Sequence, residues 1–163
     1  MKIRLKTTVI VFGALALAAG AWAQKLTEKK ALNLAVAKQI AAAAEAEAIK
    51  NKFTMVIVIV DDGGNLIYLE KMDDTQIGSI EVAQAKAHSA IAFKRPTKVF
   101  QDGVAGGNTA ILKLPGVIAT EGGIPLTADG KIIGAIGVSG GSSAQDGTVA
   151  QAGVDALPKI LAP

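Results

Sequence analysis

A run of six apolar residues, 55–60, restricts the fold more than any other feature, because five of them are β-branched. Such residues favour strands, and an uninterrupted run is typical of a strand buried on both faces. Alternate side chains of a strand point to opposite sides, so both sides of this strand need cover. We predict a homo-oligomer, a dimer or a larger assembly, as the source of part of that cover. The alternative is a monomer whose helices are divided between the two faces.

The first 23 residues have the pattern of a secretory signal peptide. Basic residues precede an apolar run at 9–19, and Ala21-Trp22-Ala23 supplies a small-residue cleavage site. The apolar run is short for a membrane span, although a retained anchor is the alternative. We predict that residues 1–23 are removed and that residues 24–163 form one periplasmic or secreted domain without a membrane span.

The charge balance changes once this segment is removed. Three of the 17 basic residues and none of the 14 acidic residues lie in 1–23, which leaves 14 basic against 14 acidic. The basic character of the whole chain therefore does not indicate a nucleic-acid partner. The chain has no cysteine, which excludes disulfides and a lipoprotein attachment.

The order of predicted elements indicates an α/β fold of the α+β kind. Two groups of strands, separated by helices, predict a five-stranded antiparallel sheet packed with helices. The predicted strands are residues 55–60, 66–70, 116–120, 124–127 and 131–138. The predicted helices run from an N-cap at Thr27 to about residue 50, from a cap at Ser79 to before Pro96, briefly over 97–101, and from Ser142 or Ser143 to Pro158.

Glycine pairs next to predicted strand ends are candidate parts of a ligand site. Gly140 and Gly141 lead into a helix start, where free backbone N–H groups can bind a carboxylate or phosphate. Asp146 lies in the first turn of that helix, where it is either functional or a cap that complements the helix dipole. Gly122 and Gly123 stand on a neighbouring predicted strand.

Residues 137–141 also match the G-x-S-x-G pattern of a hydrolase nucleophile, which would make Ser139 reactive. In that fold the histidine base follows the serine. The only histidine, His88, precedes Ser139 and belongs to another element. A serine hydrolase is therefore a minor alternative, and the glycine spacings also do not match the dinucleotide or P-loop patterns.

His88 is the single candidate metal ligand of imidazole type. On a helical wheel it falls in a polar stripe with Glu81 and Gln84 that extends toward Arg95, away from the alanine face. A solvated histidine at the edge of the core is the alternative interpretation. One histidine is too few for a zinc site of histidine and cysteine ligands.

Several motifs, taken in order, resemble the GlcG/HbpS family over nearly the whole mature chain. They are Val60-Asp61-Asp62-Gly63-Gly64-Asn65-Leu66, Ser79-Ile80-Glu81 to Lys86-Ala87, Phe93-Lys94-Arg95-Pro96-Thr97, Gly122-Gly123-Ile124-Pro125-Leu126, and Gly134-Ala135-Ile136-Gly137-Val138-Ser139-Gly140-Gly141 with Gln145-Asp146. The resemblance implies a profilin-like fold, oligomers, and a pocket around the glycine-rich loops. Members of this family include extracellular haem-binding proteins linked to redox sensing and haem degradation, a domain associated with corrinoid metabolism, and proteins encoded beside glycolate or glycerol utilisation genes.

The leading hypothesis from this resemblance is binding of haem or a related tetrapyrrole, in haem sensing, storage or degradation. His88 is the first candidate for the axial ligand and Tyr68 the second, while Arg95 and the Gly140-Gly141 amides would receive propionates. The remaining candidate binding residues are Gly122, Gly123, Pro125, Ser139 and Gln145. A second hypothesis is a small hydroxy- or keto-acid-binding protein or enzyme, with Glu121 or Asp146 as acid or base. A third is a structural oligomer without a ligand.

Overall fold

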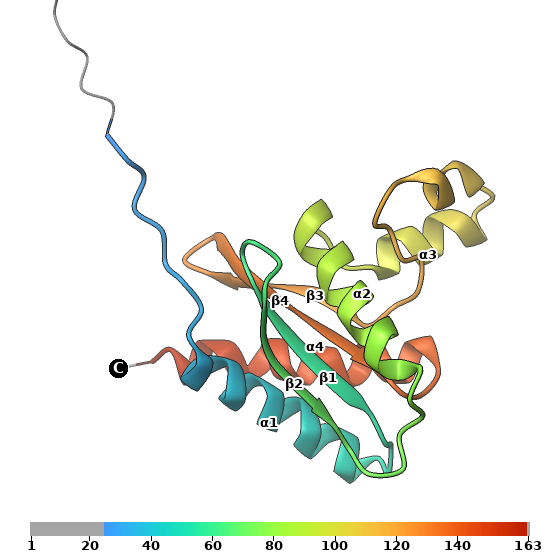
Figure 1. The fold of residues 1–163 in the computed structure, drawn as a ribbon, viewed down its shortest axis with the longest axis horizontal. Helices are drawn as coiled ribbons and strands as arrows, with labels where there is room; N and C mark the ends of the chain where they lie inside the picture. Colours follow the sequence, from blue (N-terminus) through green and yellow to red (C-terminus); the bar gives the residue numbers. More distant parts are fainter. Residues whose placement is uncertain (1–24, 163) are drawn as a thin grey trace, which may run out of the picture.

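The computed structural model of the protein describes residues 25–162, so the predicted signal peptide lies outside the described residues (Figure 1). In chain order the elements are α1 (Leu34–Lys50), β1 (Val56–Asp61), β2 (Leu66–Lys71), α2 (Ser79–Phe93), α3 (Lys98–Ala105), the 3₁₀ helix η1 (Thr109–Lys113), β3 (Gly123–Ala128), β4 (Lys131–Ser139) and α4 (Ser143–Ile160). No described helix combines the length and the apolar character that a membrane crossing requires.

The sheet is antiparallel and has four strands in the order β2-β1-β4-β3. The mixed α+β fold is confirmed, but the prediction of five strands is wrong. Residues 116–120, expected as a strand, form an irregular connection instead. Within this connection the Ile118 amide donates to the Ser89 hydroxyl at 3.2 Å, and Gly116 has a φ of +75°. Its backbone is therefore held partly by a side chain of α2 and not by a strand ladder.

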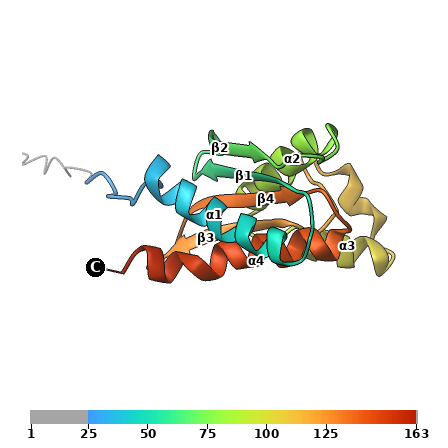
Figure 2. The same cartoon turned by 90° about the horizontal axis from the view of Figure 1, so that it is seen from below.

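Helices cover both faces of β1 within a single chain. Figure 2 shows α1 and α4 on one side of the strands and α2 on the other. Ile57 and Ile59 belong to the core shared with α1 and α4, whereas Val56, Val58 and Val60 pack with α2. The burial argument for an oligomer is therefore wrong, because the alternative division of helices satisfies the central strand.

Four of the predicted helix ends differ from the structure. The short helix predicted over 97–101 continues as α3 to Ala105. The first helix begins seven residues after Thr27, at Leu34, where the Asn33 side chain accepts from the Val36 amide at 2.9 Å. The extended residues before it allow Leu32 to reach the core, with 8% exposure. Gly78 rather than Ser79 is the N-cap of α2, and α4 continues past Pro158 to Ile160. A proline in the last turn costs few hydrogen bonds, so the helix tolerates it.

Candidate functional site

The glycine loop that follows β4 does not offer the free amides that were predicted. The Gly141 amide donates to Asp146 Oδ1 at 2.9 Å, and the Ser142 amide donates to Gln145 Oε1 at 2.8 Å. Ser142 and Gln145 together form a capping box at the start of α4. Asp146 accepts from Gly141, the residue before this N-cap, so it orders the loop and is not the cap of α4. A ligand carboxylate would have to displace these side chains first.

Directly behind this loop lies a buried ion pair that connects α2 to α4. Lys86 Nζ lies 2.6 Å from Asp146 Oδ2, and the two side chains are only 2% and 4% exposed. The same ammonium group donates to the Val138 carbonyl oxygen at 3.0 Å. Both charges are therefore paired and hydrogen-bonded inside the protein, which a buried ion pair needs in order to be tolerated.

Burial raises the pKa of the Asp146 carboxyl above its usual value, while Lys86 and the glycine amides act against that rise. The carboxylate depends on its partner because a desolvated charge without compensation is costly. Lys86 thus holds Asp146 in its charged form, and Asp146 in turn holds the loop at Gly141.

Gly122 and Gly123, at the start of β3, lie directly against Lys86 of this pair. A side chain at Gly122, whose φ is +122°, would bring its Cβ to 3.0 Å from Lys86 Nζ and 2.6 Å from the Val138 oxygen. Gly123 exchanges two hydrogen bonds with Thr97: its oxygen accepts from the Thr97 amide at 2.9 Å, and its amide donates to the Thr97 hydroxyl at 3.0 Å. The absence of side chains at both glycines is what allows β3 to approach α2 so closely.

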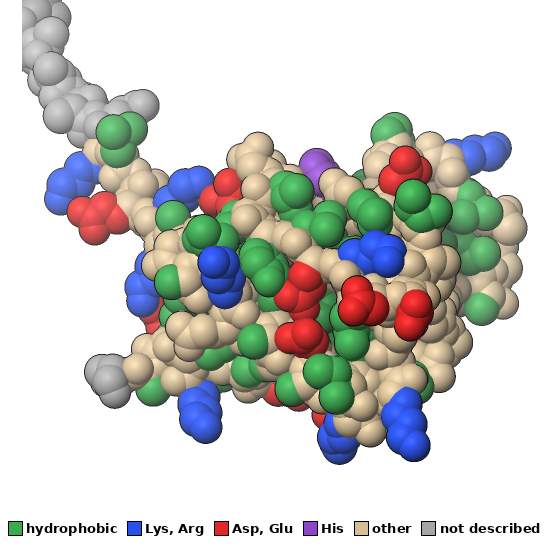
Figure 3. All heavy atoms as spheres, turned by 60° about the horizontal axis from the view of Figure 1, so that its bottom comes forward, with side chains coloured by type: hydrophobic (Ala, Val, Ile, Leu, Met, Phe, Trp, Pro, Cys, Tyr) green, Lys and Arg blue, Asp and Glu red, His purple; other side chains and the backbone are tan. Residues whose placement is uncertain are grey.

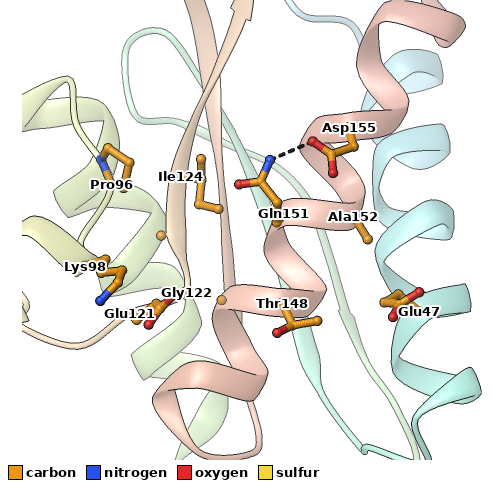
Figure 4. Close-up of a pocket in the computed structure, with 12 residues that line it drawn as sticks. Glu47, Pro96, Lys98, Glu121, Gly122, Ile124, Thr148, Gln151, Ala152 and Asp155 are labelled. Atoms are coloured by element: carbon orange, nitrogen blue, oxygen red, sulfur yellow. Dashed lines mark hydrogen bonds between the residues drawn. The ribbon is translucent and has the colours of Figure 1, made fainter.

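On the outer side of these glycines a groove of about 630 Å³ opens to solvent (Figure 4). This volume is in the range of small-molecule sites. Its lining residues are Glu47, Pro96, Lys98, Glu121, Gly122, Gly123, Ile124, Gly147, Thr148, Gln151, Ala152 and Asp155. Residues from α1, α4, β3 and the start of α3 thus share one groove, in which Glu47 is already paired with Lys50 at 3.0 Å.

The two carboxylates that were predicted as an acid and base pair do not share this groove. Glu121 lines it and rests against Gly147, where a Cβ would overlap with the glutamate side chain. Asp146 is buried behind Gly122 and bound to Lys86. Only Glu121 of the pair can therefore meet a ligand in the groove.

His88 lies elsewhere, on the exposed side of α2. Its imidazole contacts the turn between β1 and β2. The contact is close, since a Cβ added at Gly64 would lie 3.0 Å from His88 Cε1. The turn itself is ordered by Asp61, whose Oδ1 accepts from the amides of Gly63 and Asn65 at 2.8 Å each. The imidazole ring is thus accessible to a ligand on one side and contacts the turn at Gly64 on the other.

The structure does not bring His88 together with the glycine loop. In the register of β1 and β4, Val56 pairs with Ser139 and Asp61 pairs with Gly134. Gly140 therefore follows one end of these strands and Gly64 the other, which at about 3.3 Å per residue separates them by roughly 15–20 Å. One haem cannot be bound through iron by His88 and through propionates by the Gly141 amide.

Tyr68 lies on the other face of the sheet, next to the core of α1 and α4. Its hydroxyl donates to Glu70 Oε2 at 2.7 Å, and this hydrogen bond raises the pKa of Tyr68. Burial raises the pKa of Glu70, nearby Glu45 adds to the rise, and Glu70 Oε1 has no hydrogen-bond partner among the described residues. Tyr68 is engaged in this acidic cluster and cannot share a ligand with His88.

The other predicted site residues have structural contacts. The Ser139 hydroxyl bonds to that of Ser79 at 3.2 Å, at the N-terminus of α2. His88 stands nine residues further along, about 13 Å at 1.5 Å per residue, so a serine and histidine pair is absent. Arg95 is exposed, with Nε bound to the Phe93 oxygen at 3.1 Å and its guanidinium 5.9 Å from the Phe100 ring centroid. Pro125 lies on the edge strand β3, where a missing N–H costs little.

Lys86 is the important residue that sequence reasoning missed. The signal was present, because Lys86 stands on the apolar face of its helix, three residues from Ala83 and four from Ala90. A lysine at such a position needs a buried acid as its partner.

A second groove, of about 690 Å³, lies at the other end of α1 and α4, with Leu32, Ile133 and Leu157 in its lining. Neither groove contains a His, Cys, Met or Tyr among its lining residues. Over residues 25–162 there is also no group of three His, Cys, Asp or Glu side chains that could hold a metal ion.

Comparisons with known proteins agree with this fold, a single antiparallel sheet between helices with grooves at its margins. Residues 32–155 match the family described as haem degrading protein HbpS-like. Protein GlcG of Escherichia coli K12 is 41% identical over 111 residues, which are 68% of this chain and 83% of GlcG. The chain therefore belongs to the HbpS-like family, and the resemblance noted in the sequence is confirmed.

Solved structures are similar over most of the chain. A crystal structure of HbpS has a TM-score of 0.74 and 32% identity, with 82% of this chain and 94% of that chain covered. A crystal structure of PduOC in complex with haem has a TM-score of 0.71 and 33% identity, with 78% and 95% covered. Relatives with this fold thus include one that binds haem.

Proposed function

We propose that this protein is exported and binds haem or a related tetrapyrrole. The observation that carries the proposal is the similarity to PduOC, which was solved with haem and is matched over 95% of its length. Membership of the HbpS-like family supports the same ligand class. Sensing, storage and degradation of haem are the roles compatible with such binding.

His88 is the residue best suited to bind the iron. Haem iron takes histidine, cysteine, methionine or tyrosine as axial ligands. The chain has no cysteine, Met55 is fully buried, Met72 is packed against the core, and Tyr68 donates its hydroxyl to Glu70. His88 is exposed and its ring is supported by Gly64. Among these side chains it alone combines access to a planar ligand with a fixed position.

Exposed groups near His88 can provide further contacts. Leu66, which is 53% exposed and stands just after the turn at Gly64, offers an apolar surface for a porphyrin ring. Arg95, seven residues after His88, is the candidate partner for a propionate, since guanidinium and carboxylate groups form strong hydrogen bonds. The Gly141 amide is no longer a candidate, because Asp146 occupies it.

A haemin titration of residues 24–163 tests this proposal. We expect a saturable shift of the Soret band, and we expect His88→Ala to weaken binding by at least about tenfold because iron loses its strongest ligand. Gln84→Ala, one helical turn earlier on the same side of α2, is the matched control and should bind like the wild type. Absence of a Soret shift at micromolar haemin would contradict haem binding, whereas full binding by His88→Ala would contradict only the ligand.

The small-acid alternative is less well supported by the groove. Lys50 pairs with Glu47 at 3.0 Å, and Glu121 and Asp155 then leave the groove with an excess of negative charge over Lys98, which repels glycolate, lactate or glyoxylate. A thermal-shift screen with these acids distinguishes the two functions. Stabilisation by an acid and not by haemin would favour small-acid binding over haem binding. No effect of either ligand would favour a structural oligomer.

Export has its own test. Residues 1–23 have the features of a signal peptide, so the full chain expressed in a bacterium should yield a periplasmic or secreted product that begins at Gln24. Mass spectrometry of the purified product measures its first residue. A product that keeps Met1 and stays with the membrane fraction would instead indicate the retained anchor.

A further inference from the structure

The second groove, of about 690 Å³, lies where the start of α1, the turn between β3 and β4 and the end of α4 meet. Figure 2 shows these parts of the chain at the same end of the molecule, together with the segment before α1. The groove lies on the face of the sheet that α1 and α4 cover, whereas His88 belongs to α2, which covers the other face. It is therefore separate from the proposed haem ligand.

The floor of this groove is part of the main core of the protein. Leu32, Ile133 and Leu157 line it and are 8%, 4% and 2% exposed. They come from the segment before α1, from β4 and from α4. Leu32 lies directly on β4, since a Cβ added at Gly134 would lie 3.0 Å from Leu32 Cδ2. The apolar floor is thus formed before a ligand binds.

The walls of the groove are aliphatic. Val36, Pro158, Leu161 and Ala162 contribute to them, and Leu161 is 45% exposed. Over residues 25–162 the lining contains no aromatic side chain and no His, Cys or Met. A flat aromatic ligand would therefore lack a stacking partner there, and haem iron would lack an axial ligand. A hydrocarbon chain suits both the lining and the volume, which is in the range of small-molecule sites.

Basic side chains lie at the mouth of the groove. Lys30 lines it and pairs with Asp129, in a contact whose side chains are 70% and 71% exposed. Lys131 stands two residues after Asp129, and Lys159 follows Pro158. Both are exposed, and neither forms a salt bridge within the part of the chain that the structure describes. Figure 3 shows basic side chains, with apolar ones between them, at this end of the molecule. Their positive charge favours an anionic head group.

We propose that this groove binds a free aliphatic carboxylate, a fatty acid of medium chain length. The alkyl chain covers Ile133 and Leu157, and burial of this apolar surface drives binding. The carboxylate stays at the mouth, where it meets Lys131 and Lys159 without displacing Asp129 from Lys30. Exposed charge pairs contribute little, so the chain supplies most of the affinity and the lysines supply the preference for an acid.

Calorimetric titration of residues 24–163 with hexanoate, octanoate and decanoate tests the chain. Each added CH₂ group that becomes buried should tighten binding by about threefold. Leu161→Asp places a charge in the apolar wall just after α4 and should weaken binding of decanoate by at least about tenfold. Leu26→Asp, the same change at a leucine that is 94% exposed and outside the groove, is the matched control. Urea unfolding checks that both variants remain folded.

A second titration tests the head group. Lys131→Gln/Lys159→Gln should weaken binding of octanoate by about threefold to tenfold and leave that of 1-octanol unchanged, because only the acid is charged. Lys38→Gln/Lys52→Gln, with the same change in charge at exposed lysines outside the groove, is the matched control. Vesicles of anionic phospholipid should not displace octanoate, which distinguishes a free acid from a membrane lipid.

Three results would overturn the proposal. They are no binding of decanoate, an affinity that is independent of chain length, and equal affinity of the wild type for octanoate and 1-octanol. Haemin titration of Leu161→Asp keeps these outcomes separate from the proposed function, since this variant should bind haemin like the wild type.

Discussion

The two faces of the sheet are both apolar but are packed in different ways. Toward α1 and α4, the core is filled by large side chains such as Ile57, Ile136 and Leu157. Toward α2, it is filled by valine and alanine, and the helix backbone itself lies on the strand: a Cβ at Gly137 would overlap with the Ala83 carbonyl oxygen. One face is therefore closed by side-chain volume and the other by the approach of the backbone.

This difference explains where the polar pair is found. Because α2 lies so close to β4, Lys86 can reach the Val138 carbonyl and Asp146 at the same time. The pair joins α2 to the first turn of α4, and every other ion pair of the described residues is far more exposed. The close approach of α2 to β4 thus brings Lys86 within reach of both partners. Substitutions that break this ion pair are therefore expected to lower the stability of the protein.

The largest expected effect is that of Lys86→Met, which keeps the length of the side chain and removes its charge. Asp146 would then be buried without compensation, and we expect a loss of about 3–5 kcal/mol in the free energy of unfolding. Urea unfolding of residues 24–163 at pH 7 measures it. Lys38→Met, on the exposed side of α1, is the matched control and should stay within about 0.5 kcal/mol of the wild type.

The pH dependence of this variant has a defined sign. Burial places the folded pKa of Asp146 above its ordinary value of 3.8, and removal of Lys86 takes away a group that lowers it. A carboxyl with a raised folded pKa binds its proton more tightly in the native state, so its contribution to stability is present below the ordinary value and is lost as pH rises through the folded pKa. The deficit of Lys86→Met should therefore shrink when unfolding is repeated at pH 5. A deficit that grows on acidification would mean that Asp146 is not the group left uncompensated.

An intermediate loss of stability is expected from two neighbouring substitutions in β4, one on each face of the sheet. Gly137→Ala adds one methyl group against the α2 backbone and should cost about 3 kcal/mol, the upper part of the range for overpacking. Ile136→Val removes one methyl group on the opposite face and should cost about 1 kcal/mol. Thermal and urea unfolding of both variants compare them directly. Equal costs would show that α2 can move away from β4 as easily as the side chains around Ile136 can repack.

The smallest expected effect concerns Glu70, on the edge strand near α1. Burial and nearby Glu45 raise the pKa of this carboxyl above its ordinary value of 4.5, so the wild type loses stability from this group as pH rises through the folded pKa. Glu70→Gln removes the titration and should gain less than about 1 kcal/mol at pH 7, because the site is partly solvated. Unfolding between pH 4 and pH 8 measures the slope. Glu81→Gln, exposed on α2, should keep the slope of the wild type.

Much of the fold could be predicted from local patterns. The run at 55–60 identified the central strand, the turn at 62–65 identified the hairpin, and Ser142 identified the start of α4. The extra strand at 116–120 was an error of the same method, since apolar residues there pack irregularly and one amide bonds to Ser89. A pattern of residue types does not reveal which backbone groups a distant side chain will bind.

The candidate site was less predictable than the fold. The motifs with Gly122, Gly141, Asp146 and Lys86 do meet, but they meet in a closed structural connection. His88, which the same reasoning placed beside them, lies at the other end of the strands. The sequence motifs therefore indicated which glycines lie near Asp146, but they did not indicate that His88 is distant from them.

The sequence by itself determined the elements whose signals lie within a few residues: a buried strand, a glycine turn, a capped helix. Only the tertiary structure decided that α2 covers the second face, that the Gly141 amide is occupied, and that Lys86 pairs with a carboxylate 60 residues away. Local propensities act through neighbouring backbone torsions and side chains, whereas such distant pairs form only after the sheet and helices have packed and excluded water from both partners.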